Sequence, residues 1–310
     1  MDSSTKSGTS AAGRQEHRLS RWLPSREKLI ACLAVTGLLL AGCFFGVRAL
    51  EWHVTFHPSR YSDAAAKEWR LPEGTTSVWL QTADHVRLNA WFFKSDKPSQ
   101  GTLIFFHGNA GNISDVAWYG ERLRDRGFDV FLVDYRGFGR SEGESTGEQS
   151  IYADAEAAYQ YVHRTLGVAP EKIALYGQSL GTTAVIDLAS RHRCGAIIIE
   201  SGLSSADDLA VEILPAMISP LRLLAKNRFD SVRKLGQVSC PVLITHGEPD
   251  PIIPTAQAKR LFAAANEPRT LKLFPGAGHN VYGTQGNAYL NLLVDFLRLS
   301  LKTKPTNRLP

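Results

Sequence analysis

The sequence predicts an α/β fold in which helices cover both faces of a mostly parallel sheet. Short runs that are apolar throughout alternate with helical patterns along most of the chain. Such runs are typical of parallel strands, because a parallel sheet is buried on both faces. The 310 residues, of which 44% are hydrophobic, suffice for one large core or for one domain with an appendage.

Eight runs are the predicted strands of this sheet. The first two, SVWLQT and VRLNAWFF, are joined by Ala83-Asp84-His85 and predict an antiparallel hairpin. The other six are TLIFFHG, FDVFLVDY, KIALYGQS, AIIIES, PVLITHGEPD and TLKLFPGAGH. Helical patterns between or after the strands predict helices at about 114–126, 150–164 and 180–192, and an amphipathic closing helix at 290–301.

The boundaries of the main domain follow from the same patterns. We expect a connector at 48–72, the sheet domain at 73–302 and a frayed tail at 303–310. One long interruption, at 201–239, separates AIIIES from PVLITHG and contains the apolar segment VEILPAMISPLRLLAK. We expect it to form a small cap over the strand ends.

The N-terminal part predicts a membrane segment. Residues 1–28 are polar and basic and are expected to be a disordered tail. Residues 29–47 carry no charge, and as a helix they would span roughly 28 Å, close to the hydrocarbon thickness of about 30 Å. Because the tail is rich in Arg and Lys, we expect it on the cytoplasmic side and the main domain on the extracytoplasmic side.

A lipoprotein signal is the alternative interpretation of this segment. Leu40-Ala41-Gly42-Cys43 resembles the lipobox of bacterial lipoproteins, in which the cysteine is lipidated and becomes the new N-terminus. The apolar residues that follow Cys43 and the long basic tail favour an uncleaved anchor. Both interpretations give a membrane-tethered domain.

The basic charge belongs to the N-terminal part of the chain. Residues 1–48 hold seven of the 35 basic and three of the 30 acidic residues, so the remainder is nearly neutral. A nucleic-acid partner is therefore not expected.

Ser179 is the predicted nucleophile. It follows the run KIALYG and precedes a predicted helix, within Gly-Gln-Ser-Leu-Gly. A nucleophile elbow needs this arrangement, since the serine takes a strained backbone conformation that exposes its hydroxyl, and only small residues such as Gly177 and Gly181 fit two positions to either side. The similar Gly-Arg-Ser-Glu-Gly around Ser141 lacks an adjoining strand and a following helix.

Asp250 and His279 are the predicted partners of Ser179. A serine hydroxyl needs a base that takes its proton, and the base needs a carboxylate that orients it. Asp250 follows PVLITHGE and His279 follows TLKLFPGAG, so all three residues lie after strands, in the order Ser, acid, His. Glu248 is the alternative acid.

An oxyanion hole needs two backbone N–H donors. The elbow supplies the N–H of Leu180, and we assign the second donor to Asn109 in the loop His-Gly-Asn-Ala-Gly-Asn. A tight turn made by the glycines is the alternative interpretation of that loop. His107 precedes the turn and is expected to be structural.

Together, FFHGNAGN, DYRGFGRSEG, YGQSLG, HGEPDPIIP and GAGHN resemble the α/β-hydrolase superfamily. Within it they resemble the membrane-anchored branch of bud-emergence-type hydrolases and protein depalmitoylases, with a serine aminopeptidase-like domain. The resemblance covers about residues 56–301 and implies the α/β-hydrolase fold with an eight-stranded sheet. Pro251 departs from the family pattern, and the N-terminus does not resemble the lipidated N-termini of depalmitoylases, so the resemblance does not fix the substrate.

Cys194 and Cys240 each precede a strand, and in this fold the two strands would be neighbours. A disulfide between them is one interpretation, which an exported domain would permit, and two buried thiols are the other. The four cysteines lack the close spacing of a zinc knuckle, and no metal-binding or phosphate-loop motif is present. We therefore expect no metal and no cofactor.

These observations predict a membrane-tethered serine hydrolase that cleaves carboxylic esters or thioesters, as an esterase, thioesterase or lipase does. The apolar cap and the tether favour hydrophobic acyl substrates. A peptidase of the serine aminopeptidase type is a second hypothesis, and a non-catalytic receptor or scaffold with this fold is a third. The sequence does not predict the oligomeric state.

Overall fold

The computed structural model describes residues 25–61 and 71–302 of the chain. The chain divides into two compact units, residues 1–49 and 50–310. Most of the predicted N-terminal tail, part of the predicted connector and the whole predicted C-terminal tail lie outside the described residues.

The first unit contains most of helix α2 (Arg26–Thr55). The helix has a mean hydropathy of 2.3 over its most apolar window, and none of that window is buried. It is long and apolar enough to cross a membrane, a property that it shares with signal sequences. The helix begins at Arg26, inside the segment predicted to be a disordered tail.

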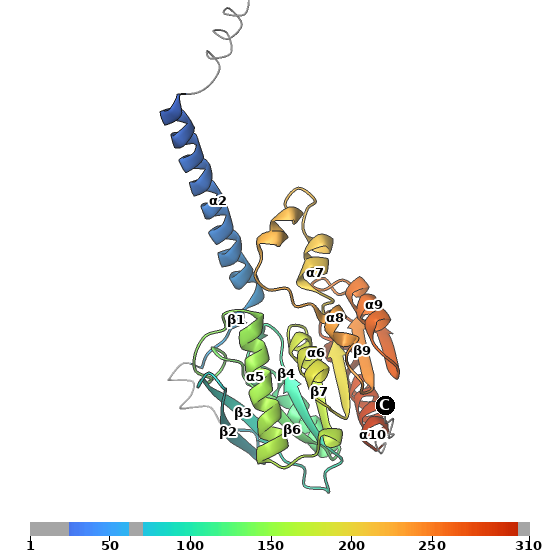
Figure 1. Ribbon diagram of the computed structural model, residues 1–310. Helices are drawn as coiled ribbons and strands as arrows, with labels where there is room; N and C mark the ends of the chain where they lie inside the picture. Colours follow the sequence, from blue (N-terminus) through green and yellow to red (C-terminus); the bar gives the residue numbers. More distant parts are fainter. Residues whose placement is uncertain (1–24, 62–70, 303–310) are drawn as a thin grey trace, which may run out of the picture. The chain divides into compact units, whose positions relative to one another are not determined.

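The second unit is built on a mixed eight-stranded sheet (Figure 1). Its strand order is β10-β9-β8-β7-β4-β6-β3-β2. All eight predicted strands are present: β2 (Thr75–Gln81), β3 (Arg87–Phe93), β4 (Thr102–Phe106), β6 (Asp129–Val133), β7 (Ile173–Gln178), β8 (Ala196–Glu200), β9 (Val242–Gly247) and β10 (Arg269–Phe274). The predicted hairpin is β2–β3, and β3 also pairs antiparallel with β6; the remaining pairs are parallel.

Two apolar layers enclose the sheet, because successive side chains of a strand point to opposite faces. On β4, Ile104 and Phe106 belong to one buried cluster and Leu103 and Phe105 to the other. Helices α5 (Glu148–Gln160), α6 (Gly181–Arg191), α8 (Ser231–Leu235) and α9 (Thr255–Ala264) cover the first face. Helices α4 (Ala117–Asp125) and α10 (Val281–Lys302) cover the second.

The segment predicted as a cap contains α7 (Ala206–Ile213), a 3-10 helix η4 (Ser219–Leu224) and α8. No residue of α7 or η4 is buried, whereas Ser231 and Leu235 of α8 are. Several large apolar side chains of this segment are exposed, among them Ile213, Met217 and Leu223.

The helices differ from the predicted ones in four places. Helix α9 was not expected at all. The helix predicted at 114–126 is a 3-10 turn η1 (Ile113–Val116) followed by α4, and α5 ends in a π-helical turn, η2 (Tyr161–Thr165). The closing helix begins nine residues earlier than predicted, and Gly286 breaks its regular geometry with a φ of 50°.

Candidate active site

Ser179 lies in the turn between β7 and α6. Its φ is 52°, in the left-handed region that is strained for a residue with a side chain. Its backbone N–H donates to the carbonyl oxygen of Glu200 on the neighbouring strand, at 2.9 Å. The turn therefore has the backbone conformation that the elbow pattern predicts.

The two glycines beside Ser179 allow this turn, because neither position has room for a side chain. A Cβ on Gly181 would lie 2.0 Å from the carbonyl oxygen of Phe106 in β4. A Cβ on Gly177 would lie 2.5 Å from the carbonyl carbon of Gly181. The backbones of β7, α6 and β4 thus pack directly against one another here, with no space for a side chain between them.

Ser141, in the competing Gly-x-Ser-x-Gly pattern, has a different environment. It is buried, its hydroxyl donates to the carbonyl oxygen of Asp134, and it accepts the N–H of Asn89, both at 2.8 Å. The hydroxyl thus joins two segments of the chain.

His279 and Asp250 are in direct contact. Nδ1 of His279 lies 2.8 Å from Oδ2 of Asp250. The other carboxylate oxygen, Oδ1, accepts the backbone N–H groups of Ile252 and Ile253 at 2.8 and 3.0 Å. The alternative acid, Glu248, is exposed. The loop that contains Pro251 thus folds back onto the Asp250 carboxylate, so the departure from the family pattern leaves the contact with His279 in place.

His246 was missed by the sequence analysis. It lies in β9, four residues before Asp250, and its Nε2 is 3.3 Å from Oδ2 of Asp250 and 2.8 Å from the carbonyl oxygen of Ile253. Burial raises the pKa of Asp250, but the hydrogen bonds from His246 and His279 outweigh it and hold that pKa well below its usual value. Asp250 is thus kept ionised beside His279.

Ser179, His279 and Asn109 line one cavity of about 260 Å³, together with Gly108 and Asn112. Leu180 follows Ser179 directly, and its side chain is buried. Within the described residues, neither the N–H of Asn109 nor that of Leu180 donates a hydrogen bond to the protein. Both groups are thus available to a substrate oxygen.

Buried contacts hold the loop that carries Asn109. His107 is 1% exposed, with Nδ1 2.8 Å from the carbonyl oxygen of Gly108 and Nε2 3.5 Å from Oδ1 of Asp134. Burial raises the pKa of Asp134, against the contact with His107. The contacts of His107 agree with the expected structural role.

A short strand pair, which the sequence analysis also missed, holds the loop that carries Asn109. Strand β1 (His57–Pro58) pairs in parallel with β5 (Ala110–Gly111), and the N–H of His57 donates to the carbonyl oxygen of Asn109 at 2.8 Å. Two-residue strands leave no periodic pattern, so the sequence gives no signal for this contact.

Glu200 is a buried acid beneath the site that the sequence analysis did not single out. Its Oε1 accepts the N–H of Val281, two residues after His279, at 3.2 Å. Its Oε2 accepts the hydroxyls of Tyr119, at 2.9 Å, and of Tyr176. Burial raises the pKa of the Glu200 carboxyl, against these hydrogen bonds. In the sequence, Glu200 is a single acidic residue at the end of the apolar run AIIIE, and this position could have indicated a buried carboxylate.

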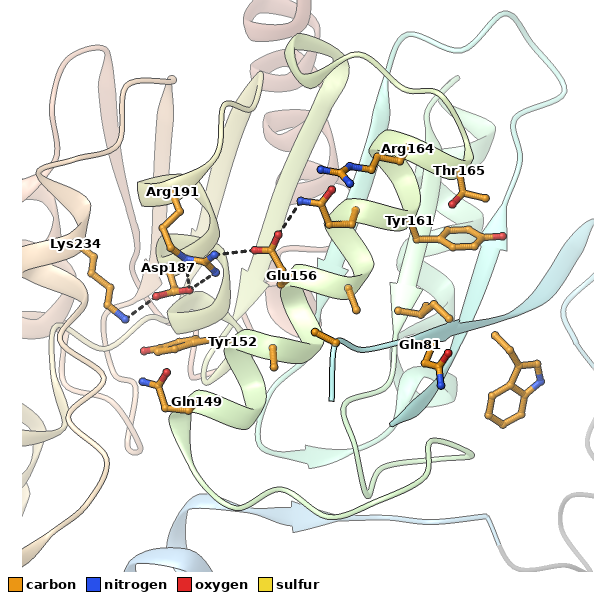
Figure 2. Close-up of a pocket in the computed structure, with 16 residues that line it drawn as sticks. Gln81, Gln149, Tyr152, Glu156, Tyr161, Arg164, Thr165, Asp187, Arg191 and Lys234 are labelled. Carbon is orange, nitrogen blue, oxygen red and sulfur yellow. Dashed lines mark hydrogen bonds and ion pairs between the residues drawn. The ribbon is translucent and has the colours of Figure 1, made fainter. Parts of the chain in front are cut away.

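A larger cavity, of about 940 Å³, lies along α5 (Figure 2), and none of Ser179, Asp250 and His279 lines it. Four of its five charged side chains form ion pairs with one another: Arg191 contacts Glu156 and Asp187, and Lys234 contacts Asp187 (Figure 2). Among the described residues, no group of three or more His, Cys, Asp or Glu side chains could hold a metal ion. The smaller cavity is the one that brings together Ser179, His279 and the free N–H of Asn109.

Comparisons with known proteins agree with this fold. A family model described as serine aminopeptidase, S33, matches residues 97–228. An uncharacterised protein of Mycobacterium tuberculosis, Rv2307c, is 31% identical over 256 residues, which are 82% of this chain and 89% of that protein. Alpha/beta hydrolase domain-containing protein 17C of Mus musculus is 35% identical over 203 residues, 64% of this chain and 61% of that protein.

Among solved structures, the esterase Pf2001 of Pyrococcus furiosus has a TM-score of 0.61 at 17% identity. The match covers 79% of this chain and 99% of that chain. At this identity the likeness concerns the fold alone.

Proposed function

Because the chain belongs to the α/β-hydrolase superfamily, we propose that it is a serine hydrolase with Ser179, His279 and Asp250 as its catalytic triad. The observation that carries the proposal is the convergence of the strained Ser179, the Asp250-bound His279 and the unpaired N–H of Asn109 at one cavity. The substrates we propose are carboxylic esters or thioesters.

The reaction would begin at the Ser179 hydroxyl. Nε2 of His279 accepts the hydroxyl proton while Oγ attacks the acyl carbonyl carbon, and Asp250 stabilises the resulting imidazolium through Nδ1–H. The N–H groups of Asn109 and Leu180 donate to the oxyanion. His279 then gives the proton to the leaving alcohol or thiol, and an acyl-enzyme on Ser179 remains.

Water completes the cycle by the same route. His279 removes a proton from the water molecule, the hydroxide attacks the acyl-enzyme, and the carboxylic acid leaves as Oγ of Ser179 is protonated again. The low pKa of Asp250 supports this role, because a carboxylate that stays ionised holds the Nδ1–H tautomer of His279 throughout the cycle.

We propose that α2 tethers the domain to a membrane, on whose extracytoplasmic side the domain lies. The helix is long and apolar enough to span a membrane, which supports the tether. The exposed apolar side chains of the cap, such as Met217 and Leu223, support hydrophobic acyl substrates.

Ester hydrolysis by the full-length chain in detergent tests this function. We expect p-nitrophenyl acyl esters to be cleaved, and Ser179→Ala to reduce kcat at least 10³-fold, as removal of a triad nucleophile does. Ser141→Ala is the matched control and should retain activity per folded molecule. An active Ser179→Ala variant would reject the proposed nucleophile.

Two alternatives predict different results in the same assay. A peptidase, favoured by the description of the matching family model, would cleave aminoacyl p-nitroanilides faster than esters. A non-catalytic receptor would cleave neither substrate and would not react with a fluorophosphonate.

A further inference from the structure

Two cysteines meet at the edge of the sheet opposite the candidate active site. Cys194 precedes β8 and Cys240 precedes β9, so both lie at the amino ends of their strands, whereas Ser179, Asp250 and His279 follow the carboxyl ends of theirs. The two Sγ atoms are 3.3 Å apart. No other element separates them, because β8 and β9 are neighbours in the sheet.

The backbone holds this pair of thiols in place. The N–H of Ile197 donates to the carbonyl oxygen of Pro241 at 2.9 Å, which joins the backbone segments beside the two cysteines. On the other side, the N–H of Gly195 donates to the carbonyl oxygen of Ile173 at 2.7 Å. Cys240 is buried and Cys194 half-buried against the apolar cluster under α5 and α6. The side chains therefore need only a small movement to reach bonding distance.

We propose that Cys194 and Cys240 form a disulfide in the exported protein, and that this bond closes the segment that carries the cap. The inference rests on the proposed extracytoplasmic position of the domain, since disulfides persist in oxidising compartments. The bond would link the two ends of residues 195–239, which contain β8, α7, η4 and α8.

The closed segment is one that a covalent link would stabilise. None of the residues of α7 or η4 is buried, so the middle of the segment gains little from core packing. A cross-link limits the freedom of this segment in the unfolded chain, and its stabilising effect grows with the length of the closed loop.

The bond would form by thiol–disulfide exchange with a disulfide-bearing oxidoreductase. The thiolate of one cysteine attacks the oxidant's disulfide and forms a mixed disulfide, and the other cysteine then displaces the oxidant as a dithiol. The pair loses two electrons and two protons, and the oxidant gains them. The hydrogen bond with Cys240, and then burial, raise the pKa of the Cys194 thiol well above its usual value, so exchange is expected before this region is packed.

Differential alkylation of the full-length chain tests the bond in cells. Membranes are quenched in acid and denatured, free thiols are blocked with N-ethylmaleimide, and the sample is then reduced and labelled with a maleimide-polyethylene glycol. We expect two labels on the wild type and none on Cys194→Ser or Cys240→Ser. Cys32 and Cys43 do not register, because they are blocked in the first step or already modified. A wild type without label would overturn the proposal.

A measurement on the purified full-length protein distinguishes whether the two thiols can form the bond from whether they form it in the cell. In detergent with oxidised glutathione, we expect the bond to form and to raise Tm by roughly 10 °C over the reduced protein, with no such difference for Cys194→Ser. If the bond does not form even there, the geometric argument is wrong. If the bond forms in vitro but not in cells, the claim that the exported protein carries this disulfide is wrong. Ester hydrolysis is measured on the same samples, so a failed disulfide is distinguished from a failed serine-hydrolase assignment.

Discussion

At the residue scale, the environment of Asp250 supports the proposal that it is the acid of the triad. Three donors face its carboxylate from its own loop and from His246, and His279 supplies the fourth. Glu248, two residues earlier, is exposed. The sequence analysis predicted Asp250 and kept Glu248 as the alternative, because both acids follow the same strand.

The low pKa of Asp250 makes a prediction about stability against pH. The folded pKa lies below the usual value of 3.8, so ionised Asp250 stabilises the fold above that value, and the contribution is lost as pH falls from about 4 toward the folded pKa. We expect Asp250→Asn to lower the free energy of unfolding by about 2 kcal/mol at pH 7. Urea unfolding at pH 7 and pH 3 should show this difference shrinking at pH 3. If wild type and Asp250→Asn differed in unfolding free energy by the same amount at pH 7 and pH 3, the low pKa of Asp250 would be contradicted.

At the element scale, the elbow depends on the close approach of β4, β7 and α6. Gly181→Ala would place a methyl group 2.0 Å from the carbonyl oxygen of Phe106, and neither backbone can move without shifting a strand of the core. We expect a loss of about 3 kcal/mol or more in the free energy of unfolding, together with loss of ester hydrolysis.

Gly236→Ala is the matched control for this substitution. Gly236 has a φ of −62°, and its nearest neighbour is 3.8 Å from the added Cβ, so its variant should unfold within about 0.5 kcal/mol of the wild type. Chemical unfolding of the two variants compares them directly, and equal effects would show that the elbow tolerates a side chain.

The Glu200 carboxylate joins three elements around the site: β7 through Tyr176, α4 through Tyr119 and the start of α10 through Val281. We propose that it positions the His279 loop against the elbow. Glu200→Ala should lose about 3 kcal/mol or more of stability, because it leaves a cavity and unpaired buried donors.

Glu200→Gln distinguishes this positioning role from simple packing. Its carbonyl oxygen can still accept the N–H of Val281, and its amide can donate to the tyrosine hydroxyl oxygens. We therefore expect Gln to recover most of the kcat that Ala loses, with KM little changed in both. If the folded Ala variant has the kcat of the wild type, Glu200 does not position the loop.

The elements that could be predicted from sequence are those with strong local patterns. Each of the eight strands is a run rich in apolar residues between turn signals, and Ser179, Asp250 and His279 each lie in the loop that follows such a run. Helix α9 was missed because its pattern, TAQAKRLFAA, is short and follows a proline-rich loop. The role of Glu200 was missed because its partners lie on β7, α4 and α10, far from it in the sequence. The role of His246 was missed because its contact with Asp250 depends on how the loop after β9 folds back.

At the scale of the whole molecule, the chain joins an apolar helix to a hydrolase domain that has its own core. Among the described residues, every member of the two buried clusters lies at position 56 or later. The Trp52 indole donates to the carbonyl oxygen of Ser145, so the chain just before β1 is also held by this unit.

Removal of residues 1–48 tests whether the hydrolase domain folds and functions without the apolar helix. We expect the truncated chain to move from the membrane to the soluble fraction and to keep the kcat/KM of the full-length protein for a short, soluble ester. Centrifugation and ester hydrolysis on the same preparations check both. A truncated chain that stays with the membrane would contradict the proposed tether, and one that is soluble and folded but inactive would assign the N-terminal segment a part in the site.

The central claim is that Ser179 carries the acyl group, and peptide mapping of a fluorophosphonate adduct tests it most directly. The full-length protein is labelled in detergent, digested with trypsin and examined by tandem mass spectrometry. We predict a single adduct on the peptide Ile173–Arg191, with fragment ions that place it on Ser179 and not on Ser190, and no adduct in Ser179→Ala. An adduct on Ser141 or another residue, or none on a folded protein, would contradict the claim.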